Sequence, residues 1–445
     1  MKRSVAIIMA ALAAAGVMSA TCLADEKSDL TVTYINNGMS DDYFAVWIQE
    51  TFDNWEKKDQ VELKINGIEA GDSDYLTKIK LMYQDASQCG DLIWDDSFVL
   101  PADAAAGYLA DITSNLEGYE AWNDGSYIEA VKNATLGSDG AFYGIPASTD
   151  SRGLLVNKSV LEAAGLGADW QPKDWAELLD GCRAIKENCE DVIPMWLSVG
   201  KVSGEGTSMN GYEMILYGTA DADQSLYDTA SGKWVVGSES ILAANEFLTT
   251  LFSEGLAGEY SEMLDSNEGS YAYEYLKNGQ LGIYLTGSWF PQMYQAGGNL
   301  EWEGYEEELA FIDMPTQNGE GTITMSGGWT WTIPALSNDV DLAFEFLTEL
   351  MKPENYQTYV IGSGNLPVQN MDEYENITSR PFYGESQDKL NAALFRPKNE
   401  MYSTVSTYIA EMSENAVVGM DAQAAMDTFA TNVESALGAD AIVTK

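Results

Sequence analysis

Apolar stretches and amphipathic stretches alternate along the chain, and this alternation indicates strands followed by helices. Residues 30–35 form a β-rich run that ends in a turn signal, and residues 43–55 place aromatic side chains at helical spacing. Residues 61–65 alternate like a strand, residues 76–83 repeat like a helix, and residues 91–94 have the composition of a buried strand. Successive strand–helix units of this kind predict an α/β fold with a largely parallel sheet.

The same pattern continues to the end of the chain. Helices are predicted over 175–185, 241–252, 344–351 and 403–437, and strands over 192–198, 281–285, 309–312 and 330–333. We find no repeat of fixed period and no low-complexity linker that would separate an independent domain.

The predicted strands indicate where a ligand would bind. In open α/β sheets, ligands bind beyond the carboxyl ends of the strands. Two segments follow strand ends in the first part of the chain, residues 36–42 and residues 95–98. We therefore expect binding side chains in both segments.

Composition narrows the possible functions. The 445 residues allow two or three domains, and 45% of them are hydrophobic, which is typical of a globular protein. The chain has 23 Lys and Arg against 70 Asp and Glu, a net charge of −47, and no histidine. Such a negative field excludes nucleic-acid binding and polybasic membrane contacts, and the missing histidine excludes Ser-His, Cys-His and His-zinc mechanisms. Carboxylate chemistry, calcium sites and ligand binding remain.

The first residues have the pattern of an export signal. Lys2 and Arg3 precede an Ala-rich apolar run that ends in small residues, which predicts a signal peptide over residues 1–24, cleaved after Ala24. The alternative is lipid attachment at Cys22, which we favour less because the residues before it fit a lipidation site poorly. In either case we expect an exported protein, periplasmic or at the cell surface.

Three cysteines remain after the predicted cleavage, so at least one is free. Cys182 and Cys189 are seven residues apart. In one helix their Cα atoms would be about 10 Å apart, too far for a disulfide. A bridge between them therefore requires that Cys189 lie beyond the end of the helix.

Acidic residues suggest two kinds of chemistry. The segment that starts at Asp221 begins like a calcium loop but has Leu226 where glycine is needed and Gly232 where glutamate is needed, so we predict no metal site. Paired carboxylates among residues 95–96, 150 and 205 are the basis for a glycoside hydrolase as an alternative function. No spacing in the sequence fixes the distance between two of them.

Two tryptophans lie in glycine-rich turns, Trp289 in TGSW at 286–289 and Trp329 in SGGW at 326–329. A tryptophan beside glycine on a loop presents a flat apolar face to a cleft. The C–H face of a sugar ring stacks on such a surface, while its hydroxyl groups need carboxylates, amides and arginine around the rim. These turns predict a binding site for a neutral sugar.

Motifs with the order and spacing of a known family run through nearly the whole mature chain. They include DLIWDDS at 91–97, AAAGYL at 104–109, YGIP at 143–146, LVNK at 155–158, the two Gly-Trp turns, GNLP at 364–367 and RP at 396–397. With these motifs the chain resembles extracellular solute-binding proteins of ABC importers, in the sugar-binding family that includes maltose- and trehalose/maltose-binding proteins.

The resemblance implies an α/β, two-lobed periplasmic-binding-protein fold of type II, with three chain crossings at a hinge and the ligand cleft between the lobes. The N-terminal lobe would comprise residues 25–145 plus 315–351, and the other lobe residues 146–314 plus 352–445. It further implies a monomer, without cofactor or catalysis, that captures a neutral mono- or oligosaccharide by lobe closure and delivers it to an ABC permease.

The resemblance also implies which residues bind the ligand. Carried over to this chain they are Asn37, Asp41, Asp95, Asp96, Asp150, Arg152, Glu205, Trp289, Gly327, Gly328, Trp329 and Arg396. The tryptophans would stack on sugar rings, Asp96 and Asp150 would accept hydrogen bonds from hydroxyl groups, and Arg396 would donate them. The loop that holds Asn37 and Asp41 differs from the maltose-type pattern, and Arg152 stands where the family usually has a small or apolar residue.

Overall fold

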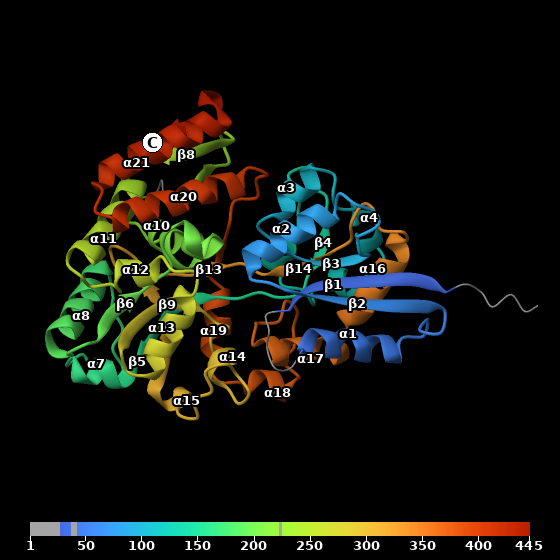
Figure 1. Ribbon diagram of the computed structural model, residues 1–445, viewed down its shortest axis with the longest axis horizontal. Helices are drawn as coiled ribbons and strands as arrows, with labels where there is room; N and C mark the ends of the chain where they lie inside the picture. The colour runs from blue at the N-terminus through green and yellow to red at the C-terminus, as the bar shows by residue number, and fades with distance from the viewer. Residues whose placement is uncertain (1–26, 37–41, 222–224) are drawn as a thin grey trace, which may run out of the picture.

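The computed structural model describes residues 27–36, 42–221 and 225–445, and within these ranges the chain forms two α/β lobes (Figure 1). One lobe contains the blue and cyan elements with the orange helices, and the other contains the green and yellow elements with the red C-terminal helices. Each lobe has its own hydrophobic core. The predicted signal peptide, with Cys22, and the predicted site residues Asn37 and Asp41 lie outside the described residues.

The first lobe is built on a five-stranded sheet. Its strand order is β2 (Val61–Glu69), β1 (Ser28–Asn36), β3 (Leu92–Asp96), β14 (Trp329–Thr332) and β4 (Gly144–Pro146). β1 pairs in parallel with β2 and β3, whereas β14 is antiparallel to both β3 and β4.

Helices cover both faces of this sheet. They are α1 (Tyr43–Asn54), α2 (Asp72–Met82), α3 (Leu100–Ala105), α4 (Thr113–Leu116), α5 (Glu120–Asn123), α6 (Glu129–Asn133), α16 (Val340–Leu350), α17 (Pro353–Ser363), α18 (Glu375–Thr378) and α19 (Tyr383–Leu390). The Asp42 side chain caps α1 by accepting a hydrogen bond from the Ala45 backbone N–H at 2.9 Å. The helix then buries Phe44, Trp47 and Ile48 against the core.

The second lobe has a four-stranded sheet in the order β10 (Leu309–Ile312), β5 (Arg152–Asn157), β9 (Leu281–Gly287) and β6 (Ile193–Trp196). β5 is antiparallel to both neighbours, whereas β6 is parallel to β9. A smaller sheet has the order β16 (Ile442–Thr444), β8 (Lys233–Gly237) and β7 (Tyr227–Asp228).

The helices of the second lobe surround these sheets (Figure 1). They are α7 (Lys158–Ala163), α8 (Trp175–Asn188), η1 (Lys201–Ser203), α9 (Glu205–Thr207), η2 (Ser208–Tyr212), α10 (Glu213–Leu216), α11 (Glu239–Ser253), α12 (Tyr260–Met263), α13 (Glu268–Lys277), α14 (Pro291–Tyr294), α15 (Tyr305–Glu308), α20 (Tyr402–Val417), α21 (Ala422–Leu437) and η3 (Ala439–Ala441). The helix predicted over 403–437 is two helices, because Gly419 adopts a positive φ of 86° between α20 and α21.

Each main sheet contains one antiparallel strand, and in each case it is the strand that the chain enters from the other lobe. β5 follows the first crossing at 147–151, and β14 follows the second crossing at 325–328. The third crossing contains β15 (Leu394–Phe395), which pairs in parallel with β13 (Met325–Ser326) in the second crossing. The predicted largely parallel sheets and the three crossings are therefore present, and the crossings account for the exceptions in strand direction.

The predicted boundary between the lobes is wrong for residues 352–390. We expect this segment in the lobe of the C-terminal helices, but most of its apolar side chains belong to the first core, and only Phe382 packs against the second core. The cause is aromatic packing: the rings of Tyr356 and Tyr359 in α17 lie 5.9 and 4.9 Å from the ring of Trp47 in α1. In the other direction, Ile323 and Met325 pack in the second core although residues 315–351 are predicted in the first lobe.

The strand β11 (Met314–Pro315) pairs with β12 (Thr322–Ile323) on the way to the second crossing.

Cys89, Cys182 and Cys189 are all free, although Cys189 lies just beyond the end of α8, where a disulfide with Cys182 was geometrically allowed. Within the described residues, no helix is both long enough and apolar enough to cross a membrane.

Candidate functional site

A cavity of about 270 Å³ lies between the two lobes, at the ends of their sheets. Residues from both lobes and from the crossings line it. Nine of the predicted site residues are in its wall: Asp96, Asp150, Arg152, Glu205, Trp289, Gly327, Gly328, Trp329 and Arg396. The structure therefore brings together side chains that are up to 300 positions apart in the sequence.

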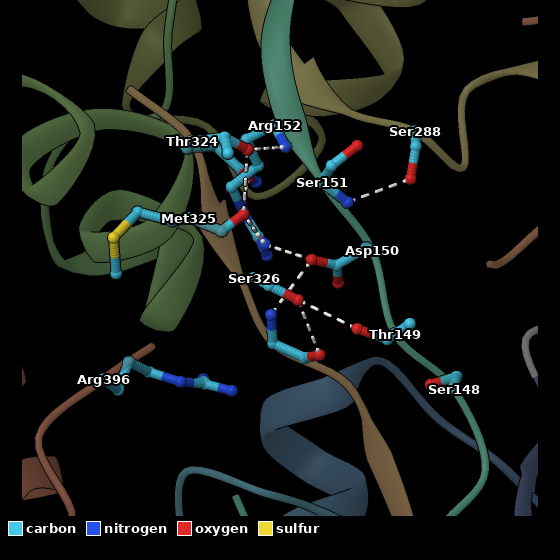
Figure 2. Close-up of polar contacts among 12 residues, drawn as sticks. Ser148, Thr149, Asp150, Ser151, Arg152, Ser288, Thr324, Met325, Ser326 and Arg396 are labelled. Atoms are coloured by element: carbon cyan, nitrogen blue, oxygen red, sulfur yellow. Dashed lines mark hydrogen bonds and ion pairs between the residues drawn. The ribbon is translucent and has the colours of Figure 1, made fainter. Parts of the chain in front are cut away.

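The first and second crossings are joined by hydrogen bonds directly beside the cavity (Figure 2). The Asp150 Oδ1 atom accepts a hydrogen bond from the Gly327 backbone N–H at 3.0 Å and forms an ion pair with Arg152. The Thr149 and Ser326 hydroxyl groups lie 2.9 Å apart. These contacts hold Asp150 at a fixed place where the chain passes between the lobes.

The glycines of the second crossing allow this close approach. Gly328 has a φ of 144°, and a Cβ atom there would lie 2.0 Å from the Ser148 carbonyl oxygen of the first crossing. A Cβ atom on Gly327 would lie 2.8 Å from Nη2 of Arg396. Backbone packing at the hinge therefore requires glycine at 328, whereas Gly327 leaves room for the guanidinium group of Arg396.

Each of the two tryptophans packs against another side chain of the cavity wall. The ring of Trp329 lies nearly parallel to that of Trp94, with 6.3 Å between centroids and an interplanar angle of 8°. The ring of Trp289 lies 5.2 Å from the Arg152 guanidinium carbon. Trp329 begins β14 and Trp289 follows β9, so both lobes contribute indole rings to the cavity, with the buried Trp94 of β3 beside Trp329.

Arg396 connects both lobes from the third crossing. Its Nη2 atom donates to Asp96 Oδ1 at 3.2 Å and to Ser97 Oγ at 2.9 Å, and its Nη1 atom donates to Glu205 Oε1 at 3.1 Å. The guanidinium carbon also lies 5.2 Å from the ring of Phe98. The side chain is only 8% exposed, so its charge is compensated almost entirely by these two carboxylates.

A chain of acidic groups continues from Glu205 into the second lobe. Burial raises the pKa values of Asp96 and Glu205, and the Arg396 charge partly offsets both rises. The Tyr402 hydroxyl lies 2.8 Å from a carboxyl oxygen of Glu205 and 2.8 Å from one of Glu213, so it hydrogen-bonds with both. Burial, with the charge of Glu205, raises the pKa of Glu213 to about 8, so Glu213 is mostly protonated at neutral pH.

Asp95 differs from the other predicted site residues, because its side chain points away from the cavity. It is fully buried beneath the sheet, where it accepts a hydrogen bond from the Tyr83 hydroxyl at 2.8 Å. Burial and the charge of Asp103 raise its pKa well above the usual range. Successive side chains of a strand point to opposite faces, so Asp95 and Asp96 cannot both face the ligand.

Several cavity residues are not predicted from the sequence: Tyr43, Phe44, Asp72, Asn210, Gln292, Tyr359 and Asn365. Asp72 could have been predicted, because it follows β2, whose carboxyl end lies at the same sheet edge as that of β1. It was missed because the alternating pattern ends the predicted strand near Ile65, whereas β2 continues to Glu69. Asn365 lies in the GNLP motif without being identified as a site residue. Asn210, in η2, has no local signal.

The whole-chain comparison decides the family. The model of the family described as bacterial extracellular solute-binding protein matches residues 50–376, about three quarters of the chain. The chain belongs to this family of extracellular solute-binding proteins. The resemblance noted from the motifs is thereby confirmed.

Solved structures share the fold of this solute-binding protein. An ABC transporter solute-binding protein from Thermotoga lettingae, bound with alpha-D-tagatose, is 22% identical with a TM-score of 0.77, and the match covers 93% of this chain and 100% of that one. Maltose-bound T. maritima MalE3 is 18% identical with a TM-score of 0.76, covering 92% and 100%. The cyclic alpha-maltosyl-1,6-maltose binding protein from Arthrobacter globiformis is 20% identical with a TM-score of 0.73, covering 93% and 100%. A comparison with curated protein sequences finds no match.

The side chains of this solute-binding protein are suited to hydrogen bonding and stacking. Among the described residues, no group of three or more Cys, Asp or Glu side chains is arranged to hold a metal ion. The cavity instead offers the indole rings of Trp94, Trp289 and Trp329, four carboxylates, the amides of Asn210, Gln292 and Asn365, and two guanidinium groups that are already paired.

Proposed function

We propose that this solute-binding protein captures a neutral carbohydrate in the cavity between its lobes, with an oligosaccharide favoured. The observation that carries the proposal is the pair of supported indole rings, one from each lobe, in a wall that is otherwise rich in carboxylates and amides. Indole faces stack on the C–H surface of a sugar ring, and carboxylate and amide oxygens accept hydrogen bonds from its hydroxyl groups.

Proteins of the same fold support this ligand class. Their bound molecules are tagatose, maltose, acarbose, cycloalternan, mannobiose and ribitol, which are all rich in hydroxyl groups. The range extends from a polyol to a cyclic oligosaccharide. The fold therefore supports a polyhydroxylated ligand. Which sugar or polyol binds depends on this chain's own residues.

The charges in the cavity favour a neutral ligand over an anionic one. Arg152 is paired with Asp150, and Arg396 is paired with both Asp96 and Glu205. Asp72 adds a further carboxylate to the wall. An acidic sugar would face a net negative cavity in which both guanidinium groups are already engaged, and this repulsion would weaken its binding.

The ligand would act by stabilising a closed arrangement of the lobes. A sugar that contacts Trp329 in the first lobe and Trp289 in the second gains both contacts only when the lobes are close together. This differential affinity shifts the population toward the closed form. Delivery of the closed form to an ABC permease, by an exported monomer, completes the proposal and agrees with the extracellular family.

Catalysis is not part of the proposal. A glycoside hydrolase needs one carboxylic acid to protonate the leaving group and a second carboxylate to act as nucleophile or base. Asp96 and Glu205 both bind Arg396, and Asp150 binds Arg152, so these carboxylates are placed as hydrogen-bond acceptors. Members of the family are binding proteins.

A thermal-shift screen of the exported protein tests the proposal. The panel contains maltose, mannobiose, tagatose and ribitol, with glucuronate and glucose 6-phosphate as anionic counterparts. We expect at least one neutral compound to raise the melting temperature, because a ligand that binds only the folded protein stabilises it, and we expect no shift with the anions. Stabilisation by the anions alone would contradict the proposed ligand class.

A further inference from the structure

Arg152 begins β5 directly opposite Gly287 of β9, and this pairing sets where Trp289 lies. A Cβ atom on Gly287 would lie 1.8 Å from the indole ring of Trp289. Because glycine has no such atom, the ring folds back over the strand pair and reaches the side chain of Arg152. The guanidinium carbon lies 5.2 Å from the ring centroid, within the range of a cation–π contact.

The guanidinium group of Arg152 is held in place by three different segments. Nε donates to Asn210 Oδ1 at 2.8 Å. Figure 2 shows that Nη1 donates to Asp150 and also to the Met325 carbonyl oxygen, the latter at 3.2 Å. The residue is only 6% exposed. The rigid planar fork of arginine satisfies these acceptors together, whereas a lysine ammonium group would reach them one at a time.

The contact with Arg152 also determines how Asp150 is oriented. Oδ1 of Asp150 accepts from Arg152 and from the Gly327 backbone N–H. Oδ2 of Asp150 makes no hydrogen bond to any described residue, and Asp150 lines the cavity. One oxygen is therefore used by the hinge and the other is available to a ligand.

We propose that Arg152 is a positioning residue of the carbohydrate site. It packs against the Trp289 ring and holds Asp150 so that Oδ2 is available to the ligand, and it affects the sugar through these two residues. This inference rests on the proposed function. The resemblance implies that Arg152 binds the ligand directly, whereas here it positions two other residues that do. The site is then preorganised before any sugar arrives, which reduces the entropic cost of binding.

The position of Trp289 can be tested without a ligand. In protein labelled with 5-fluorotryptophan, the Trp289 and Trp329 fluorine resonances are assigned with Trp289→Phe and Trp329→Phe. We expect Arg152→Met to shift or broaden the Trp289 resonance and to leave that of Trp329 in place. Arg183→Met is the matched control, because Arg183 pairs with Glu254 and Asp180 on the surface and should move neither resonance.

Arg152→Lys retains a charge for Asp150 and serves if the methionine variant does not fold. A Trp289 resonance that is identical in the wild type and in the folded Arg152 variants would overturn the proposal. If the resonance moves but no sugar of the panel binds the wild type, the proposed function fails while the positioning of Trp289 stands. The two results are therefore distinguishable.

A double-mutant cycle with the panel sugar that binds the wild type tests the path through Trp289. We expect Arg152→Met alone to lower affinity by about tenfold, which is the size of a well-formed cation–π support. In a Trp289→Ala background the same change should cost much less, because the ring that Arg152 supports is gone. Fully additive losses would show that Arg152 acts independently of Trp289, and would overturn the proposal.

Discussion

Trp329 lines the cavity while its ring packs on Trp94, so one aromatic side chain fixes the orientation of the other. We predict that Trp329→Ala lowers the affinity for a neutral sugar by about 1–3 kcal/mol, because a stacking surface is lost. Calorimetric titration measures the change. Trp302→Ala is the control, since Trp302 is also half-buried but packs on Tyr294 away from the cavity. Equal affinities of Trp329→Ala and wild type would remove Trp329 from the site.

Glu213 makes stability depend on pH. The pKa of Glu213 rises from 4.5 to about 8 on folding, so the folded protein holds a proton that the unfolded chain releases. Its contribution to stability is fully present below about pH 4.5 and is lost as the pH rises toward 8. We predict that Glu213→Gln, which stays neutral, gains stability relative to wild type between pH 5 and 8, on the order of 3 kcal/mol.

Urea unfolding of both proteins at pH 5 and pH 8 checks this prediction. Buried carboxyl groups with raised pKa values that do not interact with Glu213, such as Asp95, contribute equally to both proteins and cancel in the difference. A difference between wild type and Glu213→Gln that is the same at both pH values would contradict the buried, protonated Glu213.

At the scale of single residues, the sequence predicts side chains whose local pattern is unusual. The Gly-Trp turns and the acids after a buried strand stand out, and most of these residues line the cavity. Asn210 and Gln292 do not stand out, because an ordinary helical amide becomes a cavity residue only through tertiary packing. Asp95 and Asp96 look equivalent in sequence, and only the alternation of the strand separates them.

The crossings are the elements on which the site depends. A Cβ atom at Gly328 would lie 2.0 Å from the Ser148 carbonyl oxygen, and its φ of 144° is unfavourable for other residues. We predict that Gly328→Ala lowers the free energy of unfolding by about 2–4 kcal/mol, through strain and displacement of the first crossing. Denaturant unfolding monitored by circular dichroism measures the loss.

Gly384→Ala is the control for this change. Gly384 lies in α19, and a methyl group added there would have no neighbouring atom within 4 Å, so alanine should be neutral or slightly stabilising. Wild-type stability of Gly328→Ala would contradict the close approach of the two crossings.

Helices and strands with a regular pattern are predictable at this scale. β10 spans Leu309–Ile312, as its apolar run predicts, and α8 begins at Trp175 behind an Asp174 cap. The reversed direction of β5 and β14 has no signal within either strand, because it depends on which lobe the chain comes from. The packing of α17 on α1 likewise cannot be predicted from the sequence, because an apolar helix face does not indicate which element it packs against.

For the whole molecule, 70 acidic residues against 23 basic ones give a net charge of −47, so most acidic side chains have no basic partner. Most acidic side chains are exposed and repel one another, and this repulsion destabilises the compact state. We predict that the melting temperature rises as sodium chloride increases from about 0.02 to about 0.5 M, because salt screens exposed charges. A melting temperature that does not change with salt would contradict a destabilising surface field.

The two-lobed arrangement follows from the resemblance rather than from periodicity, and its hinge contains the site. Asp150, Gly327 and Arg396 lie in the three crossings, so ligand contacts and lobe movement involve the same residues. A sugar in this cavity would contact both lobes and the hinge at once. Binding and closure are then expected to be a single event.

Calorimetric titration of the full exported protein with maltose, mannobiose, tagatose and ribitol tests the central claim most directly. Saturable binding of at least one of these neutral compounds, with one site per chain and with the compound recovered unchanged, is the predicted result. No binding by any of them, or release of new reducing ends from the disaccharides, would contradict the account.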